Sequence, residues 1–398
     1  MKKNKKVVLA FSGGLDTSFC AIHLAKEKGY EVHTVAVNTG GFNDAEQNAL
    51  ANKATKLGIK HHTCINVEHT FYEQGIKYLL YGNVLKNHTY PLSVSAERVF
   101  QAIAIAEYAK QIGADAIAHG STGAGNDQIR FDLIFNVMVP NLEIITPIRD
   151  MKLSREEEVG YLVQHGIKEE WEKAKYSINK GLWGTSVGGD ETLTSNLPLP
   201  EEAWPTKLTR KDSITLEIGF KKGEPVRLND TLLSPIQLIK KLQALAQPYG
   251  VGRDVHVGDT IIGIKGRVGF EAAAPIILIK AHQLLEKHVL GKWQMHWKDQ
   301  LANWYGMLMH EAQFLDPVMR DIEVFLESTQ YNVTGTVKIK LESKQIELLG
   351  IESDNDLMQT NQGQYGEINN GWSGEDVKGF TKILANATQI QNAVHQND

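Results

Sequence analysis

The chain has little of what marks exported, disulfide-rich or membrane-spanning proteins. Only two cysteines occur among its 398 residues, Cys20 and Cys64, and neither belongs to a CxxC or Cys/His metal-binding spacing. A disulfide framework or a structural zinc site is therefore not expected. The first apolar run, Val7–Phe11, ends at a Ser-Gly-Gly turn and is too short for the core of a signal peptide. No membrane span follows it. We expect a cytoplasmic protein.

Charges of one sign do not gather anywhere along the chain. There are 42 Lys and Arg against 47 Asp and Glu, which gives a formal net charge of -5. A protein that follows a nucleic-acid backbone needs a broad basic surface, so we expect no nucleic-acid partner.

With 42% hydrophobic residues, the chain can bury a full core and is long enough for two domains. Small-molecule chemistry is favoured.

The first 150 residues alternate short β-branched runs with amphipathic helical stretches, a pattern typical of parallel strands joined by crossover helices. The sequence therefore predicts a doubly wound α/β domain. In such sheets ligands bind beyond the carboxyl ends of the strands, so we expect the loops after Phe11, Val37 and Ala118 to line one crevice. The predicted strands are Lys6–Phe11, Glu31–Val37, Lys60–Ile65, Ala116–Ala118 and Glu143–Ile145, and the predicted helices are Leu15–Lys28, Asp44–Leu57 and Ser95–Ile112.

After about residue 165 the alternation ends, and the proline-rich stretch Thr192–Pro205 is typical of a connector. Beyond it, hairpin-like strands and helices predict an α+β part. We predict a nucleotide-binding domain at 1–168, a synthetase domain at 169–362 and a tail at 363–398 with a helix. The apolar stripe of that helix could pack on its own domain or on a neighbouring subunit. The predicted elements are strands at Ile214–Phe220, Thr336–Leu341 and Gln345–Ile351 and helices at Pro235–Ala246 and Pro275–Val289.

The segment Ser12–Ser18, SGGLDTS, follows the first predicted strand and opens the first helix. Backbone N–H groups and the helix dipole make that position a ready anion site, and two glycines let a phosphate approach the backbone. The segment is not a Walker A loop, because the Gly-Lys-Ser/Thr ending is absent. A purely structural strand-to-helix turn is the alternative.

Two further segments carry unusual polar residues. His119–Asp132 places Thr, Asn, Asp and Arg directly after a predicted strand, side chains that suit a zwitterionic amino acid. His119 itself, at a strand end, is more typical of a hydrogen-bonded structural histidine. Tyr176–Ser186 combines aromatic, hydroxyl and glycine residues, which suits a substrate-lining loop, although a packed surface turn explains it equally well.

Taken in this order, and with Tyr90-Pro91-Leu92 and Ser95 upstream, the three segments resemble the argininosuccinate synthase family of the ATP pyrophosphatase superfamily. The resemblance runs from Val8 to about Glu271, with a looser match to the end. It implies an ATP-dependent carbon–nitrogen ligase of arginine biosynthesis that joins citrulline to aspartate through citrullyl-AMP and releases AMP and pyrophosphate. It also implies Mg²⁺ with the ATP, no tightly bound organic cofactor, and a homotetramer.

The resemblance assigns roles by position. ATP would contact Ala10, Phe11, Ser12, Gly13, Gly14, Leu15, Asp16, Thr17, Ser18, Val37 and Gly120. Aspartate would be held by Thr122, Asn126 and Asp127, and citrulline by Tyr90, Ser95, Asn126, Arg130, Ser177 and Ser186. The catalytic candidates are Asp16, which would also anchor Mg²⁺, Asp127 and Arg130. The acceptor of the aspartate amine proton stays open among Asp127, the phosphate of the intermediate and solvent.

The chain departs from the family pattern at one end of the citrulline site. Gly258 and Phe270 stand where most members carry a citrulline-contacting glutamate and tyrosine. Asp259 could replace the lost carboxylate, and a register shift in the stretch from Gly252–Asp254 to Lys265–Arg267 is equally allowed. Alternatively, the pocket could accept a citrulline acylated on its α-amino group.

Other protein classes are less well supported. Amidating synthetases and tRNA-modifying thiolases of the superfamily bring a glutaminase domain, catalytic cysteines or a basic RNA surface, none of which is visible in the sequence. A non-catalytic nucleotide-binding module would leave the 120–130 cluster without a use.

Overall fold

The computed structural model describes residues 5–167, 171, 175–360, 365–366 and 371–395. Contacts within the chain divide it into two compact units, residues 1–354 and 355–398. The first unit holds the sheets and every cavity described below. The domain division at 168 and 362 stays a prediction.

The N-terminal part is built on a five-stranded parallel sheet with strand order β3-β2-β1-β4-β5. Each predicted strand is present with its ends within one residue of the prediction. The doubly wound α/β prediction is therefore confirmed. The strands are β1 (Lys6–Ala10), β2 (Glu31–Asn38), β3 (His61–Asn66), β4 (Ala116–Ala118) and β5 (Glu143–Ile145).

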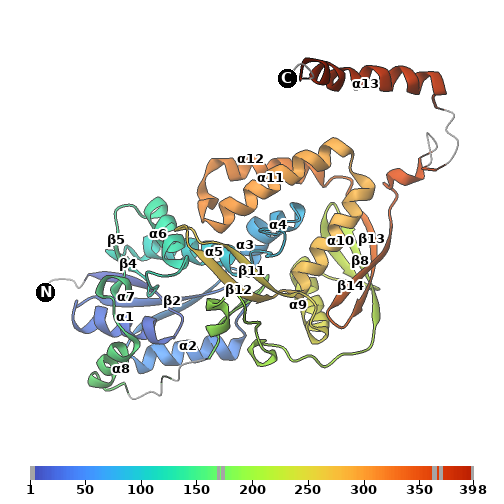
Figure 1. Cartoon of the computed structure of the whole chain (residues 1–398). Coiled ribbons are helices and arrows are strands. Elements are labelled where there is room, and N and C mark those ends of the chain that lie inside the picture. Colours follow the sequence, from blue (N-terminus) through green and yellow to red (C-terminus); the bar gives the residue numbers. More distant parts are fainter. Residues whose placement is uncertain (1–4, 168–170, 172–174, 361–364, 367–370, 396–398) are drawn as a thin grey trace. The chain divides into compact units, whose positions relative to one another are not determined.

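Alternate residues of β1, the central strand, pack in different hydrophobic cores, because successive side chains of a strand point to opposite faces of the sheet. Val8 belongs to one cluster together with α5 residues, whereas Val7 and Leu9 belong to a second cluster with α1 residues. Figure 1 accordingly shows α5 and α6 on one side of the sheet and α1 and α2 on the other. The helices around this sheet are α1 (Leu15–Lys26), α2 (Asp44–Lys56), α5 (Ser93–Ile112), α6 (Asp127–Met138), α7 (Pro147–Met151) and α8 (Arg155–Gln164).

Strand order reverses between β1 and β4, and this switch point opens a crevice beyond the carboxyl ends of the strands. The loops that follow β1, β2 and β4 all reach it, as predicted.

The rest of the first unit is α+β, also as predicted. One antiparallel sheet has the order β10-β9-β8-β13-β14 and another the order β11-β12-β7-β6. Their strands are β6 (Ser177–Gly181), β7 (Gly184–Gly188), β8 (Ile214–Lys221), β9 (Glu224–Leu228), β10 (Thr231–Leu232), β11 (Arg253–Asp259), β12 (Lys265–Glu271), β13 (Gly335–Glu342) and β14 (Gln345–Glu352). The helices are α3 (Glu68–Phe71), α4 (Lys77–Tyr81), α9 (Pro235–Ala246), α10 (Ala273–Val289), α11 (Lys292–His310) and α12 (Pro317–Thr329).

Two of the predicted loops are partly regular structure. The segment Tyr176–Ser186 is mostly the hairpin β6–β7, held as a ribbon because β7 also pairs with β12. In the second polar segment, Asp127 already begins α6, so the residues that follow it project from a helix. Both corrections make the site more rigid than loops would be.

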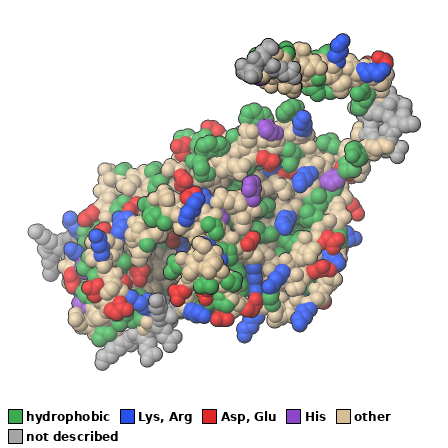
Figure 2. Space-filling model, viewed as in Figure 1, with side chains coloured by type: hydrophobic (Ala, Val, Ile, Leu, Met, Phe, Trp, Pro, Cys, Tyr) green, Lys and Arg blue, Asp and Glu red, His purple; other side chains and the backbone are tan. Residues whose placement is uncertain are grey.

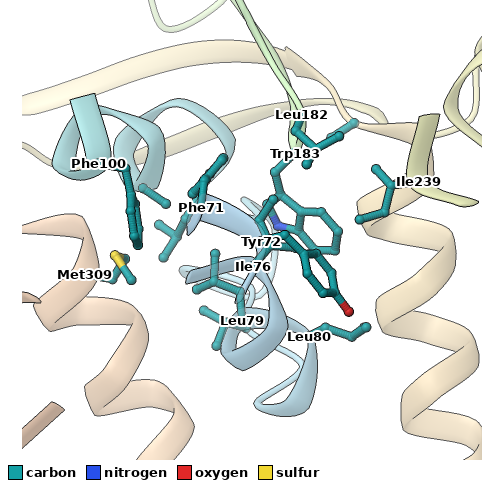
Figure 3. Packing of buried hydrophobic residues seen from close by; sticks show 14 of the residues in the cluster. Phe71, Tyr72, Ile76, Leu79, Leu80, Phe100, Leu182, Trp183, Ile239 and Met309 are labelled. Atoms are coloured by element: carbon teal, nitrogen blue, oxygen red, sulfur yellow. The ribbon is translucent and has the colours of Figure 1, made fainter. Parts of the chain in front are cut away.

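A buried aromatic side chain fixes the turn of the β6–β7 hairpin. Trp183 lies between the two strands in sequence and is fully buried. Figure 3 shows it beside Tyr72 and Leu182, with Ile239 close by. This packing holds the hairpin strands, and with them Ser177 and Ser186, against the helical core.

The second unit contains α13 (Gly374–His395), the predicted C-terminal helix. Its apolar residues Val377, Phe380, Leu384 and Ile390 recur at helical spacing.

Across the described residues, none of the helices has the length and apolar character that crossing a bilayer requires. On the face shown in Figure 2, basic and acidic side chains are interspersed without a broad patch of one sign.

Candidate active site

Two adjoining cavities open at the switch point of the parallel sheet. Their volumes are about 590 Å³ and 510 Å³. The smaller lies over the β1–α1 loop, and the larger lies between α5, α6, the β6–β7 hairpin and the β11–β12 ribbon. Both are lined by Asp16, Gly120, Ser121, Asp127, Ser177 and Asn179. A molecule in one cavity can therefore meet a molecule in the other at these residues.

The smaller cavity has the features of a phosphate site. Gly14 caps α1 without a side-chain hydrogen bond, so the first N–H groups of the helix are available to an anion. Gly13 has φ +73°, and an added Cβ would lie 2.7 Å from Leu50 Cδ2, so this position requires glycine. Of the predicted ATP-binding residues, those that line the cavity are Ala10, Phe11, Ser12, Gly14, Leu15, Asp16, Thr17, Val37 and Gly120.

Two predicted ATP-binding residues do not line the cavity. Gly13 shapes the turn, and the side chain of Ser18 is fully buried with no hydrogen-bond partner for its Oγ within the described chain. The backbone N–H of Ser18 donates to the carbonyl of Gly14 at 3.0 Å, so the structure does not turn Ser18 toward the cavity.

Asp16 lies at the junction of the two cavities and faces a second carboxyl group. Glu158 from α8 lies close enough to Asp16 for the two carboxyl groups to affect each other's pKa. Burial raises the pKa of Asp16, and burial together with the nearby Asp16 raises the pKa of Glu158 to about 7. The proximity of the two carboxyl groups therefore disfavours a negative charge on both of them at once. Carboxylate and hydroxyl oxygens are the ligands that Mg²⁺ prefers, and Asp16 lines the smaller cavity together with the hydroxyls of Ser12 and Thr17, so these side chains fit that ion.

In the larger cavity, Asp127 is held between two guanidinium groups. Its Oδ2 accepts from Arg98 Nε at 3.0 Å, and its Oδ1 accepts from Arg130 NH1 at 2.9 Å. Burial alone would raise the pKa of Asp127, but the two arginines outweigh it and hold the pKa below its usual range. A carboxylate with so low a pKa is a poor proton acceptor. Asp127 is suited to orienting a cationic or amine group.

Every predicted amino-acid-binding residue lines the larger cavity. Arg130 is fixed there by donating from Nε to the carbonyl of His310 at 3.0 Å, and Asn126 Oδ1 accepts from the N–H of Ile261 at 2.9 Å. The structure thus brings together Tyr90, Ser95, Thr122, Asn126, Asp127, Arg130, Ser177 and Ser186.

His119 has a structural role. Its Nε2 lies 2.8 Å from Asp132 Oδ1, and its Nδ1 accepts from the N–H of Ser121 at 3.2 Å. Both ring nitrogens are therefore occupied. The ring sets the path of the loop at Gly120, which lines both cavities.

One end of the larger cavity is built from imidazoles. An added Cβ on Gly258 would lie 2.6 Å from His256 Nε2, so His256 occupies the space beside that glycine. The Tyr90 ring stacks on His256 with centroids 5.3 Å apart and lies 5.4 Å from the Phe270 ring. Asp259 also lines the cavity, but its carboxylate is paired with Lys265 at 2.7 Å.

His310 completes this end of the cavity as a neutral ring. Burial, reinforced by Arg130 and Lys86, lowers its pKa to about 2. Among the described residues, neither His310 Nε2 nor His256 Nδ1 has a hydrogen-bond partner. Buried polar atoms normally have one, so these two nitrogens are exceptions beside the cavity, and neither is exposed to it in this structure.

The low pKa of His310 predicts an acid-sensitive fold. Below the ordinary histidine pKa of 6.5 the unfolded chain gains a proton that the native ring, with a pKa of about 2, does not take up. The free energy of unfolding should therefore fall as pH drops below 6.5, by about 2 kcal/mol between pH 7 and pH 5 from this group alone. Urea midpoints at pH 7, 6 and 5 measure the slope. His310→Gln should reduce it, whereas His88→Gln, at an exposed position, should leave it unchanged; equal slopes in all three proteins would contradict the assignment.

Sequence reasoning missed several residues of the site. Arg98 and Glu97 lie on α5, and their charges within a mostly apolar helix were a usable signal. Asn179 lies in the segment Tyr176–Ser186, but the sequence did not assign it a role. Its Oδ1 accepts from Arg98 NH2 at 2.8 Å. His256 and His310 carried no local signal, because each reaches the cavity through the tertiary fold.

Comparison with known proteins agrees with this arrangement. The N-terminal part, residues 6–168, matches the family model described as the arginosuccinate synthase N-terminal HUP domain, and residues 176–391 match that of the arginosuccinate synthase C-terminal domain. The chain is 39% identical to the argininosuccinate synthase of Methanocaldococcus jannaschii over 349 residues, 87% of this chain and 88% of the relative. It is 35% identical to that of Xylella fastidiosa over 406 residues, 99% of each chain. With the Dictyoglomus turgidum protein the identity is 36%, covering 96% of each.

Proposed function

The chain belongs to the argininosuccinate synthase family, and from this premise we propose how its two cavities divide the reaction. The protein is an ATP-dependent carbon–nitrogen ligase of arginine biosynthesis. It joins citrulline to aspartate, with release of AMP and pyrophosphate. The observation that carries the proposal is the junction of the cavities at Asp16, Gly120 and Asp127.

The chemistry requires such a junction. A ureido carbon is a poor electrophile and its oxygen a poor leaving group, so activation comes first. The ureido oxygen of citrulline attacks the α-phosphate of ATP, the bond to pyrophosphate breaks, and citrullyl-AMP forms. The amine of aspartate then attacks the activated carbon and AMP departs. The α-phosphate would lie where the cavities meet, with ATP on one side and both amino acids on the other.

The smaller cavity would bind ATP and stabilise the leaving pyrophosphate. The N–H groups at the start of α1, with Ser12 and Thr17, would face the β,γ-phosphates. One well-placed donor of this kind can be worth about 3 kcal/mol in the barrier. Asp16, supported by Glu158, would hold Mg²⁺, which when bound neutralises charge on the phosphates.

The larger cavity would hold the two amino acids. The planar fork of Arg130 suits an α-carboxylate, and Thr122, Asn126 and Asp127 would hold aspartate. Because the pKa of Asp127 is held low, we assign the proton of the aspartate amine to the phosphate of the intermediate or to solvent.

Compartment and assembly are further parts of the proposal. Cys20 and Cys64 are both free thiols, which supports a reducing compartment, the cytoplasm. The family resemblance implies a homotetramer, and the apolar stripe of α13 is a surface that could serve it. Light scattering of the purified protein measures the assembly directly.

The test of the proposed function is pyrophosphate release by purified protein with Mg-ATP. Citrulline and aspartate are added singly and together. Release that requires citrulline, with argininosuccinate and AMP formed only when aspartate is also present, is the expected result. Asp16→Ala should abolish release. ATP binding without release under any combination would favour a non-catalytic nucleotide-binding module instead.

A second candidate substrate is favoured by the imidazole end of the larger cavity. The carboxylates that line this cavity beyond Asp16 are Asp127 and Asp259, and both are ion-paired. Arg267 also lines it, and its guanidinium donates to the carbonyls of Glu191, Thr194 and Leu197. This end offers positive charge and neutral rings rather than a free carboxylate partner for an α-ammonium group. The same chemistry on a citrulline acylated at that nitrogen is therefore the alternative.

Steady-state kinetics with citrulline and with N-acetyl- and N-succinyl-citrulline distinguish the two substrates. If the acylated substrate is the true one, it should have the higher kcat/KM, and His256→Ala should reduce that preference. A clear preference for plain citrulline removes the alternative and leaves the ligase function intact.

A further inference from the structure

Three metal-ligating side chains converge at the opposite end of the parallel sheet from the cavities. Glu31 and His33 lie at the start of β2, and His61 at the start of β3. Glu31 Oε1 lies 3.0 Å from His33 Nε2 and 3.9 Å from His61 Nε2. One possible ligand atom from each residue lies within 4.8 Å of the others, and within the described residues no other group of His, Cys, Asp and Glu meets this criterion.

The strand register produces this convergence. His33 and His61 are directly paired across β2 and β3, so their side chains leave the same face of the sheet. The two rings stack with centroids 4.3 Å apart and an interplanar angle of 8°, and both Nε2 atoms face the same carboxylate oxygen. Because β3 is an edge strand, the group lies where solvent can reach it.

The donor set fits a late first-row divalent cation. Imidazole nitrogens with one carboxylate suit Zn²⁺, Ni²⁺ or Cu²⁺, whereas Mg²⁺ prefers oxygen ligands alone. Tetrahedral Zn²⁺ with bonds of about 2.0–2.1 Å needs ligand atoms about 3.3 Å apart. The 3.0 and 3.9 Å separations of Glu31 Oε1 from the two nitrogens bracket that value. A small rotation of the exposed His61 side chain would complete the geometry, and water would fill the fourth position.

A second layer of contacts orients the more buried ring. His33 Nδ1 lies 3.5 Å from the hydroxyl of Tyr108, which in turn accepts from Thr63 Oγ1 at 3.4 Å. In the metal-free protein Nε2 carries the proton and donates to Glu31. With a metal on Nε2, the proton sits on Nδ1 and is donated to the Tyr108 hydroxyl. Partners of this kind fix the tautomer of ligating histidines.

We propose that Glu31, His33 and His61 form a binding site for Zn²⁺ or a related late first-row cation that is separate from the Mg-ATP site. A metal held there would join the edge strand β3 to β2. It would therefore stabilise the sheet without touching the substrates.

The test is a calorimetric titration of the full-length, nucleotide-free protein with Zn²⁺. We expect one equivalent to bind and to raise Tm. His61→Gln and Glu31→Gln, both at accessible positions, should each weaken binding at least tenfold and abolish the Tm shift. Tyr108→Phe should weaken it by about tenfold. His69→Gln, an exposed histidine outside the group, should bind like the original protein.

Cu²⁺ gives an independent spectroscopic readout. Electron paramagnetic resonance of the protein with one equivalent of Cu²⁺ should show two coordinated imidazole nitrogens, and His61→Gln should leave one. The proposal is overturned if Zn²⁺ binding and the Tm shift survive in His61→Gln and Glu31→Gln, or if binding falls equally in His69→Gln. Absence of a saturable one-equivalent phase in the original protein overturns it as well.

Discussion

Asp127→Asn lowers kcat/KM for aspartate by about 10²–10³-fold. The substitution keeps the shape of the side chain but removes the charge that lies between Arg98 and Arg130. Arg130 is then buried without a carboxylate partner, which costs about 3–5 kcal/mol, whereas Arg98 keeps its ion pair with Glu97 at 3.0 Å. Part of that cost moves Arg130 from its position in the cavity. Steady-state kinetics with varied aspartate measure the loss.

Asp132→Asn is the matched control for this prediction. Asp132 lies on the same helix and is also held between two cationic or proton-donating groups, His119 at 2.8 Å and Arg149 at 2.6 Å. It lines neither cavity. We expect a loss of stability with a much smaller loss of kcat/KM. Equal losses of activity in the two variants would assign the effect of Asp127 to folding and remove it from the site.

The parallel sheet was predictable from the sequence because its strands are buried on both faces. Such strands are short continuous runs of apolar and β-branched residues, and Val7–Leu9 and Val35–Val37 are of this kind. The loops that follow them are constrained by the rule for ligand sites in open α/β sheets. Of the residues that the family resemblance assigns to ATP, all except Gly13 and Ser18 line the cavity at this edge of the sheet, and their contacts with ATP stay a prediction.

The second sheet of the site was not predictable in the same way. β6 (Ser177–Gly181) and β7 (Gly184–Gly188) are rich in glycine, serine and asparagine, which have low strand propensity. They are strands because they pair with each other and because β7 also pairs with β12, more than 80 residues along the chain. Trp183, buried at their turn, supplies the packing that local propensity lacks.

The imidazole end of the cavity depends on contacts that no local pattern encodes. His310 is 180 residues from Arg130, which donates to its carbonyl. His256 gains its position from strand pairing beside Gly258. The sequence identified Gly258 and Phe270 as departures from the family pattern. Only the fold shows that histidine rings lie at this end of the cavity.

A buried ionic network connects the helices behind the site. Lys298 of α11 and Glu286 of α10 are both fully buried, with Nζ 2.9 Å from Oε2. Lys298 also donates to the carbonyl of Tyr81 at 2.8 Å. Glu286 accepts from Asn83 and Gln330, which each contact one ring nitrogen of His282. Three separate parts of the chain thus meet at one carboxylate.

Lys298→Met should destabilise the protein by about 3–5 kcal/mol. It fills the volume of the lysine stem but leaves the Glu286 carboxylate buried with neutral partners alone, and an uncompensated buried charge costs about that much. Urea unfolding followed by tryptophan fluorescence measures the change. A cost below about 1 kcal/mol would show that Asn83 and Gln330 suffice to stabilise the carboxylate.

The double variant Lys298→Met/Glu286→Gln separates charge from packing. Glutamine keeps the size of the side chain and can still accept a hydrogen bond from Asn83 or Gln330, while the unpaired charge is gone. If charge is the cause of the Lys298→Met defect, the double variant should recover most of the lost stability, because replacing a buried ion pair as a whole is often nearly neutral. If the double variant is as unstable as the sum of the single variants, the network stabilises the fold through its hydrogen-bond geometry, and the contact between Lys298 and Tyr81 becomes the cause to test next.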